Sequence, residues 1–331
     1  MNLTAPVFGS IWPSRIAVRS RGRSTPWAAG LWAAACVALC ASAVSVAAQV
    51  VNPATQGPPP TQAPVTQTPP ASADARRRSF EMAPVDVYAA APLKEEDLIG
   101  TYGQPRWTAA RRFGETRVYV VPKGTVEFEY WLTPERNRDG VTVTESQYEF
   151  EFGLPHRFQL DLYAVGHQTG NAGLFGIDQQ KVEVRYALAD WDKIWGNPTL
   201  YAEWKSISGA PAHFEGKLLL GGQFRARWHW GSNLVWEHET GGEHENSNEW
   251  TTGVSYTLAD TKASVGLETQ LALVNREMSP GIRGPFSTEL LVGPSLQFRP
   301  LPQVHLDVVP LFGVTDAAPR LKMFVVFGWE F

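Results

Sequence analysis

The chain has 331 residues, a formal net charge of -4 and two cysteines, Cys36 and Cys40. An acidic balance argues against nucleic acid as a partner, because nucleic-acid-binding domains are typically basic. Both cysteines lie in an apolar N-terminal run with the character of a removable signal, so the mature protein would have neither disulfides nor thiolate chemistry.

Residues 1–48 have the features of a secretory signal peptide. Four arginines precede an apolar run, 27–48, that ends in Val46-Ala47-Ala48 before Gln49, similar to an A-x-A cleavage site. The alternative is an uncleaved helical anchor, because the run is longer than a usual signal core. Since this segment carries four arginines and no acid, its removal would take the net charge from -4 to -8. Later stretches lack a helical membrane span, so we expect membrane crossing by strands.

Residues 49–122 are predicted to be a periplasmic linker, first Pro-rich and then basic. The stretch 49–75 is rich in Pro, Thr and Gln and cannot bury enough apolar surface to offset its ordering entropy. The basic part directly precedes an acidic region, and this charge asymmetry suggests a plug that docks into a barrel mouth. The alternative is an ordinary solvated tether. The predicted plug residues are Arg106, Arg111, Arg112 and Arg117.

From Lys123 to the C-terminus, apolar and polar residues alternate with a period of two, which indicates half-buried β-strands. We predict an all-β fold, an antiparallel transmembrane β-barrel of about twelve strands over 123–331. An even number of strands places both ends of the barrel on the periplasmic side. The predicted strands are 124–134, 142–154, 157–168, 176–188, 198–208, 212–223, 228–240, 247–258, 262–276, 286–298, 303–315 and 319–331.

Alternation alone also fits a soluble β-sandwich, whose apolar rows face inward. The export signal and the tryptophans near strand ends favour a membrane barrel, because aromatic residues gather at membrane interfaces. These tryptophans are Trp131, Trp204, Trp228, Trp230, Trp250 and Trp329. The final strand ends its apolar row with Phe327, Trp329 and Phe331, which resembles the C-terminal assembly signal of bacterial outer-membrane barrels. The resemblance implies the barrel-assembly machinery as a partner.

The row opposite the apolar one repeatedly carries charge and is predicted to face the lumen. In a water-filled pore these carboxylates would favour cations; the alternative is a narrow barrel filled by salt-bridged side chains, with Lys217 among the bases. The predicted lumen-facing residues are Glu127, Glu129, Glu149, Glu151, Asp161, Lys181, Glu183, Arg185, Glu203, Lys205, Glu237, Glu268 and Glu289.

The segments 127–131, Glu-Phe-Glu-Tyr-Trp, and 148–154, Tyr-Glu-Phe-Glu-Phe-Gly-Leu, carry a family resemblance. They resemble a hairpin of Gram-negative outer-membrane proteins, the proposed transporters of phenol meta-degradation pathways. The resemblance covers 123–331. It implies an outer-membrane barrel, and a transport role in which some relatives are proposed to pass hydrophobic or aromatic compounds.

Two further patterns are candidate sites. The loop 238–245, with two histidines and three glutamates, could hold a divalent cation, but a solvated acidic loop fits the spacing better. An acyl hydrolase would need a Ser and a His within hydrogen-bond distance and a third group that orients the His. His229 and Ser232 are three residues apart and should point to opposite faces of a strand. His213 and Ser208 have no evident third group to orient the His. We expect no enzyme activity, cofactor or metal.

The sequence therefore predicts an outer-membrane channel or passive transporter that passes small solutes through an acidic lumen. We expect it in the Gram-negative outer membrane, in contact with lipid and lipopolysaccharide, with the N-terminal segment in the periplasm. The alternatives are a closed structural or surface-interaction barrel and, third, an outer-membrane acyl hydrolase.

Overall fold

The computed structural model describes residues 92–170 and 176–331. The predicted signal peptide and the Pro-rich part of the predicted linker lie outside the described residues. Within these ranges, no helix is long and apolar enough to cross a membrane.

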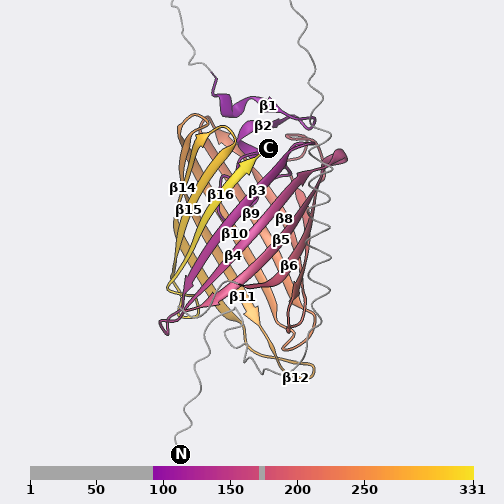
Figure 1. Cartoon of the computed structure of the whole chain (residues 1–331), viewed down its shortest axis with the longest axis vertical. Coiled ribbons are helices and arrows are strands. Elements are labelled where there is room, and N and C mark those ends of the chain that lie inside the picture. The colour runs from indigo at the N-terminus through magenta and orange to yellow at the C-terminus, as the bar shows by residue number, and fades with distance from the viewer. Residues whose placement is uncertain (1–91, 171–175) are drawn as a thin grey trace, which may run out of the picture. The chain divides into compact units, whose positions relative to one another are not determined.

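Twelve antiparallel strands of the described residues form a closed barrel (Figure 1). Each strand pairs with its neighbours along the chain, and the last pairs with the first to close the ring, with Phe327 opposite Tyr130. The strands are β3 (Val126–Arg136), β4 (Thr142–Gly153), β5 (Phe158–Thr169), β6 (Gly176–Ala187), β7 (Thr199–Ile207), β8 (His213–Arg225), β9 (Trp228–Glu239), β10 (Asn246–Ala259), β11 (Ala263–Asn275), β14 (Ser287–Leu301), β15 (Val304–Gly313) and β16 (Leu321–Glu330). They match the twelve predicted ranges closely.

Proline interrupts the ladder between β14 and β15. Pairing runs to Val292 opposite Phe312 and resumes at Leu296 opposite Val308, and the gap contains Pro294 and Pro310. Proline has no backbone N–H to donate to a ladder, so the strands stay side by side here without regular pairing.

The two faces of the barrel wall have opposite chemistry. Large apolar side chains point outward: Leu234 is 52% exposed and Leu267 is 53% exposed. Glu149 and Asp161, in contrast, are fully buried in the interior. An apolar outer belt around a charged interior is the pattern of a barrel that contacts lipid and not water. The predicted fold, an antiparallel transmembrane barrel of about twelve strands, is confirmed, and a soluble sandwich is excluded.

One interface tryptophan was assigned to the wrong face. Trp131 is only 8% exposed, because it lies on the same row of β3 as Glu127 and Glu129 and points inward. Strand parity outweighs the tendency of tryptophan to lie at membrane interfaces. Trp204, Trp228, Trp250 and Trp329 are exposed on the outside of the barrel.

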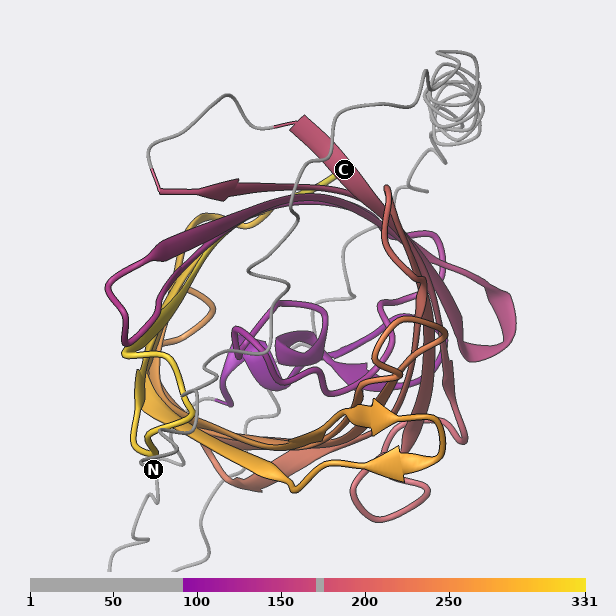
Figure 2. The same ribbon diagram turned by 90° about the horizontal axis from the view of Figure 1, so that it is seen from below.

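Residues 92–122, here called the inner segment, precede the barrel. Their first part lies at one end of the barrel (Figure 1), and their later part lies inside the ring of strands (Figure 2). The segment has little regular structure of its own. It contains two one-turn 3-10 helices, η1 (Lys94–Glu96) and η2 (Arg106–Thr108), and a two-residue pair of strands, β1 (Leu98–Ile99) and β2 (Gln104–Pro105). At the other end of the barrel, a small hairpin of β12 (Glu277–Ser279) and β13 (Ile282–Arg283) extends the loop before β14.

Candidate functional site

The inner segment is anchored to turns at the end of the barrel where β3 begins. The backbone N–H groups of Lys94 and Glu95 donate to the Asp260 carboxylate at 2.8 and 3.0 Å. The Tyr102 hydroxyl donates to the Leu154 carbonyl at 2.8 Å, and the Tyr119 hydroxyl donates to the carbonyl of residue 189 at 2.6 Å. These bonds hold the segment to three different turns of the wall.

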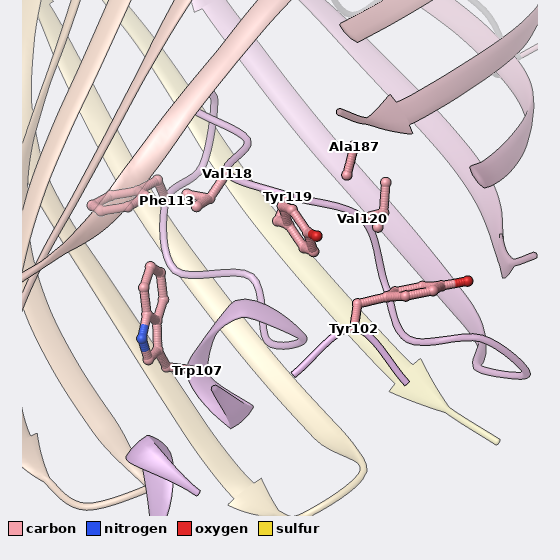
Figure 3. Packing of buried hydrophobic residues seen from close by; sticks show 7 residues of the cluster. All are labelled: Tyr102, Trp107, Phe113, Val118, Tyr119, Val120 and Ala187. Atoms are coloured by element: carbon pink, nitrogen blue, oxygen red, sulfur yellow. The ribbon is translucent and has the colours of Figure 1, made fainter. Parts of the chain in front are cut away.

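An apolar cluster packs the inner segment against the inside of the wall (Figure 3). Most of its members belong to the inner segment itself, and Ala187 comes from the end of β6. Trp191, in the turn after β6, packs edge-on against Trp107 and Tyr119, with ring centroids 5.6 and 5.2 Å apart. The remaining members are Tyr102, Phe113, Val118 and Val120.

Three glycines provide the space for this packing. Gly221, Gly231 and Gly253 lie directly opposite one another on β8, β9 and β10 and form what we call the glycine stripe. A Cβ atom at Gly221 would lie 2.3 Å from Val118 Cγ1, and one at Gly253 would lie 2.4 Å from Phe113 Cδ1. Any side chain on the stripe would therefore overlap the inner segment.

The extended part of the inner segment takes its backbone hydrogen bonds from side chains of the wall. Gly114 N–H and Glu115 N–H donate to the two carboxylate oxygens of Glu268 at 2.8 and 3.1 Å. The Asn233 side chain accepts from Arg117 N–H at 2.8 Å and donates to the Arg117 carbonyl at 2.6 Å. Buried backbone groups need such partners, so the wall is complementary to this segment.

Two arginines of the inner segment reach a cluster of wall carboxylates, Glu129, Glu149 and Glu151, here called the carboxylate cluster. Arg111 binds both oxygens of Glu129, with its Nε 2.8 Å from Oε1 and its Nη2 bonded to Oε2. Arg117 Nη2 lies 2.9 Å from Glu149 and 3.1 Å from Glu151. All three carboxylates are buried, so the arginines compensate charges that water does not reach.

The electrostatics of Arg117 follow from this position. Burial alone lowers the pKa of its guanidinium, but the carboxylates of Glu151, Glu149 and Glu129 outweigh burial and hold that pKa well above its usual value. The guanidinium is therefore a permanent cation beside the carboxylate cluster.

The other predicted plug arginines behave differently. Arg112 is buried but pairs with Glu95 of the same segment at 2.8 Å, and not with a wall carboxylate. Arg106 is exposed, because it begins η2 at the end of the barrel. Arg112 also docks inside the barrel, because its Nη1 donates to the Thr257 hydroxyl of β10 at 2.9 Å, whereas of the four arginines Arg111 and Arg117 reach the carboxylate cluster.

The predicted lumen-facing residues lie in the barrel interior, where many pair with one another. Arg185 lies 3.1 Å from Asp161 and also pairs with Glu183. Lys205 lies 2.6 Å from Glu215 and 3.1 Å from Glu237. Others in this interior set are Glu127, Glu203, Glu268 and Glu289, which are buried, and Lys181, whose Nζ donates to Gln147 at 2.9 Å. The interior is thus a network of ion pairs crossed by the inner segment.

His305 and Asp307 are among the interior residues missed from the sequence. His305 Nε2 lies 2.9 Å from Glu127 and 3.2 Å from Glu129, and Asp307 flanks the same ring. Both belong to one row of alternating residues on β15, and Val304, Leu306 and Val308 belong to the other row. That alternation was visible in the sequence and would have identified them as inward-facing.

Cavities between the inner segment and the wall are small. One of about 40 Å³ is lined by Arg111, Arg117, Glu129 and Glu151, among others. A second, of about 20 Å³, lies beside Glu95. These volumes accommodate a few water molecules but no organic solute.

The residues of the two other sequence patterns make the following contacts. In the 238–245 loop, Glu245 pairs with Arg276, and the ring of His238 stacks on that of His244. On β9, His229 is fully buried against Trp107, whereas the Ser232 hydroxyl accepts from Trp250 Nε1 at 2.7 Å. His229 and Ser232 therefore serve packing and hydrogen bonding on different faces of the strand.

Comparisons with known proteins find structural likeness and no sequence relatives. No protein-family model matches the chain, and no curated protein matches it. The chain is similar to the COG4313 outer membrane channel from Pseudomonas putida F1, with 8% identity, 67% of this chain and 100% of that chain covered, and a TM-score of 0.46. It is also similar to the NanC porin (12% identity, 62% and 98% covered, TM-score 0.43) and the KdgM porin (9% identity, 62% and 99% covered, TM-score 0.43). At these identities the shared feature is the barrel fold alone.

Proposed function

We propose that the protein is an outer-membrane channel whose lumen is closed by its own inner segment. The observation that carries this proposal is the binding of Arg111 and Arg117 to the carboxylate cluster, because these contacts are noncovalent and can break while the segment stays linked to β3. The apolar outer belt supports a lipid environment. The signal-like N-terminus supports export to the Gram-negative outer membrane, with the inner segment entering from the periplasm.

The charge of the open lumen follows from its wall residues. Around Arg111 and Arg117 the wall contributes acids that include Glu129, Glu149, Glu151, Asp161 and Glu183, together with Arg185 and His305. Departure of Arg111 and Arg117 would leave this ring strongly acidic. An acidic constriction attracts cations and repels anions, so we propose a cation-preferring lumen.

Lipid, lipopolysaccharide and the barrel-assembly machinery are proposed partners. The outward row of the last strand, including Trp329 at 42% and the terminal Phe331 at 75% exposure, offers an accessible apolar end to such machinery. The resemblance to transporters of phenol meta-degradation pathways implies hydrophobic or aromatic solutes, but the charged lining described above favours polar cations.

The test is conductance in planar bilayers after removal of residues 92–118. We expect the deletion variant to conduct and to prefer potassium over chloride, and the full chain to conduct rarely. A matched control is Arg106→Ala, which alters an exposed arginine of the same segment and should leave closure unchanged. A deletion variant that is folded, as judged by heat-modifiable migration in gels, but does not conduct would overturn the proposal.

A closed structural or surface-interaction barrel is the second candidate. It is favoured by ion pairs made within the wall itself, such as Lys205 with Glu215 at 2.6 Å and Lys217 with Glu215 at 2.7 Å, which fill the interior independently of the inner segment. The same deletion distinguishes the two functions, because such a barrel would remain closed.

A further inference from the structure

We propose that the wall site occupied by Arg111 is a recognition site for a guanidinium group, and that the solutes favoured by this channel carry one. This inference rests on the proposed function, since a solute can reach the site only after the inner segment has left it. In the structure the site is occupied by the Arg111 side chain of the inner segment. The groups that surround Arg111 indicate which other ligands would bind there.

The first argument is the geometry of the contacts to Arg111. Its Nε and Nη2 atoms bind the two oxygens of the same carboxylate, that of Glu129. This two-pronged arrangement requires a planar group with two parallel N–H donors, which a guanidinium has and an ammonium lacks. The site therefore distinguishes between cations of equal charge.

The second argument is an aromatic platform. The central carbon of the Arg111 guanidinium lies 4.0 Å from the ring centroid of Trp131. A flat cation stacks on such a face with its donors still directed at the carboxylate beside it. This explains why Trp131 lies on the charged row of β3, where a tryptophan has no role at the lipid interface.

The third argument is that the wall prepares the site without help from the inner segment. Trp131 Nε1 donates to Glu129 Oε2 at 3.1 Å, and His305 Nε2 lies 3.2 Å from Glu129 Oε1. Glu151 accepts from Gln159 Nε2 at 3.0 Å. These partners orient the carboxylates from the wall side, so a site of the same shape would face an incoming solute.

A metal ion is the competing occupant. One oxygen from each member of the carboxylate cluster lies within 4.8 Å of the others, close enough to share a cation. A divalent ion would use those oxygens but not the indole face. The contact with Trp131 therefore favours the planar organic cation.

The experiment uses the full chain with Arg111→Ala, which empties the guanidinium position and keeps the rest of the segment. Isothermal titration calorimetry in detergent would compare methylguanidinium, methylammonium and Mg²⁺. We expect saturable binding of methylguanidinium roughly ten-fold or more tighter than methylammonium, as charge-assisted bidentate bonding implies. Trp131→Leu in the same background should selectively weaken the binding of methylguanidinium. Trp236→Leu, which changes a side chain on the outer face, should leave that binding unchanged.

Equal affinity for the two organic cations, or tighter binding of Mg²⁺, would overturn the inference. Arg111→Lys provides a second route if the alanine variant does not fold: lysine keeps the charge but cannot make the two-pronged contact, so open probability in bilayers should rise. Unchanged open probability would also contradict the inference. If the segment-deletion variant never conducts while methylguanidinium binds as expected, the site stands and only the channel function falls.

Discussion

The glycine stripe gives the most direct test that the inner segment closes the barrel by close packing. In the variant Gly253→Ala, the new Cβ would lie 2.4 Å from Phe113 Cδ1 and 2.8 Å from Phe113 Cε1. Carbon atoms in contact prefer separations of about 3.5–4.0 Å, so the phenyl ring has to move by roughly 1 Å. Overpacking of this kind typically costs about 1–3 kcal/mol.

That cost falls on the closed state alone. Phe113 belongs to the inner segment, whereas Gly253 belongs to the wall, so an alanine in β10 meets no ring once the segment has left. Since about 1.4 kcal/mol corresponds to ten-fold in an equilibrium constant, the ratio of open to closed channels should rise roughly 5-fold to 150-fold. Single-channel open probability in planar bilayers measures this ratio directly.

The matched control is Gly216→Ala on β8. Gly216 lies on the outer row, and the nearest atom to a Cβ there is Phe214 Cε1 at 3.8 Å, an ordinary contact. Adding Phe113→Ala to Gly253→Ala removes the ring that causes the overlap, so the double variant should open no more than Phe113→Ala alone. A folded Gly253→Ala barrel with the open probability of the parent would refute the packing argument.

Three other outcomes are expected. Arg117→Met removes one of the two cations that bind the carboxylate cluster and should weaken docking of the inner segment by about 3–5 kcal/mol, observed as faster proteolysis of that segment in detergent; unchanged proteolysis would contradict the ion-pair argument. A cysteine at Leu267 in the outer belt should resist a membrane-impermeant maleimide in proteoliposomes, whereas one at Val141 in a loop should react, and equal labelling would argue against a lipid-facing belt. Removal of Phe331 should slow the appearance of heat-resistant barrel in cells without lowering the stability of barrels already formed, and normal assembly kinetics would exclude it from the assembly signal.

The barrel could be predicted from sequence because its determinants are local. Each strand shows its own alternation, so Phe128 and Glu129 take opposite faces whatever the neighbouring strand contains. Trp131 was misassigned because a general tendency of tryptophan was given more weight than parity along the strand. His305 and Asp307 were missed although parity alone places them inward.

The structure of the inner segment could not be predicted from local sequence patterns. Its 3-10 turns and two-residue strands have no periodic pattern, since they are stabilised by wall residues distant in sequence, such as Asp260 and Glu268. The glycine stripe was equally hidden: each glycine is visible in the sequence, but only the register between β8, β9 and β10 shows that they align. Charge asymmetry indicated that arginines would dock, but which of them reach the wall depends on the path of the chain.

Under the proposed function, closure of the barrel and ordering of the inner segment are coupled, because both depend on contacts with the wall. Because the wall supplies hydrogen-bond partners for Gly114, Glu115 and Arg117, a segment that leaves the lumen loses the contacts that fix its backbone. It then regains conformational entropy of about 1–2 kcal/mol per residue, which opposes the ion pairs and the apolar cluster. Opening of the barrel would then convert the inner segment from an ordered to a disordered state. Since the segment stays attached to β3, its return is intramolecular, and the ratio of open to closed barrels should not depend on protein concentration.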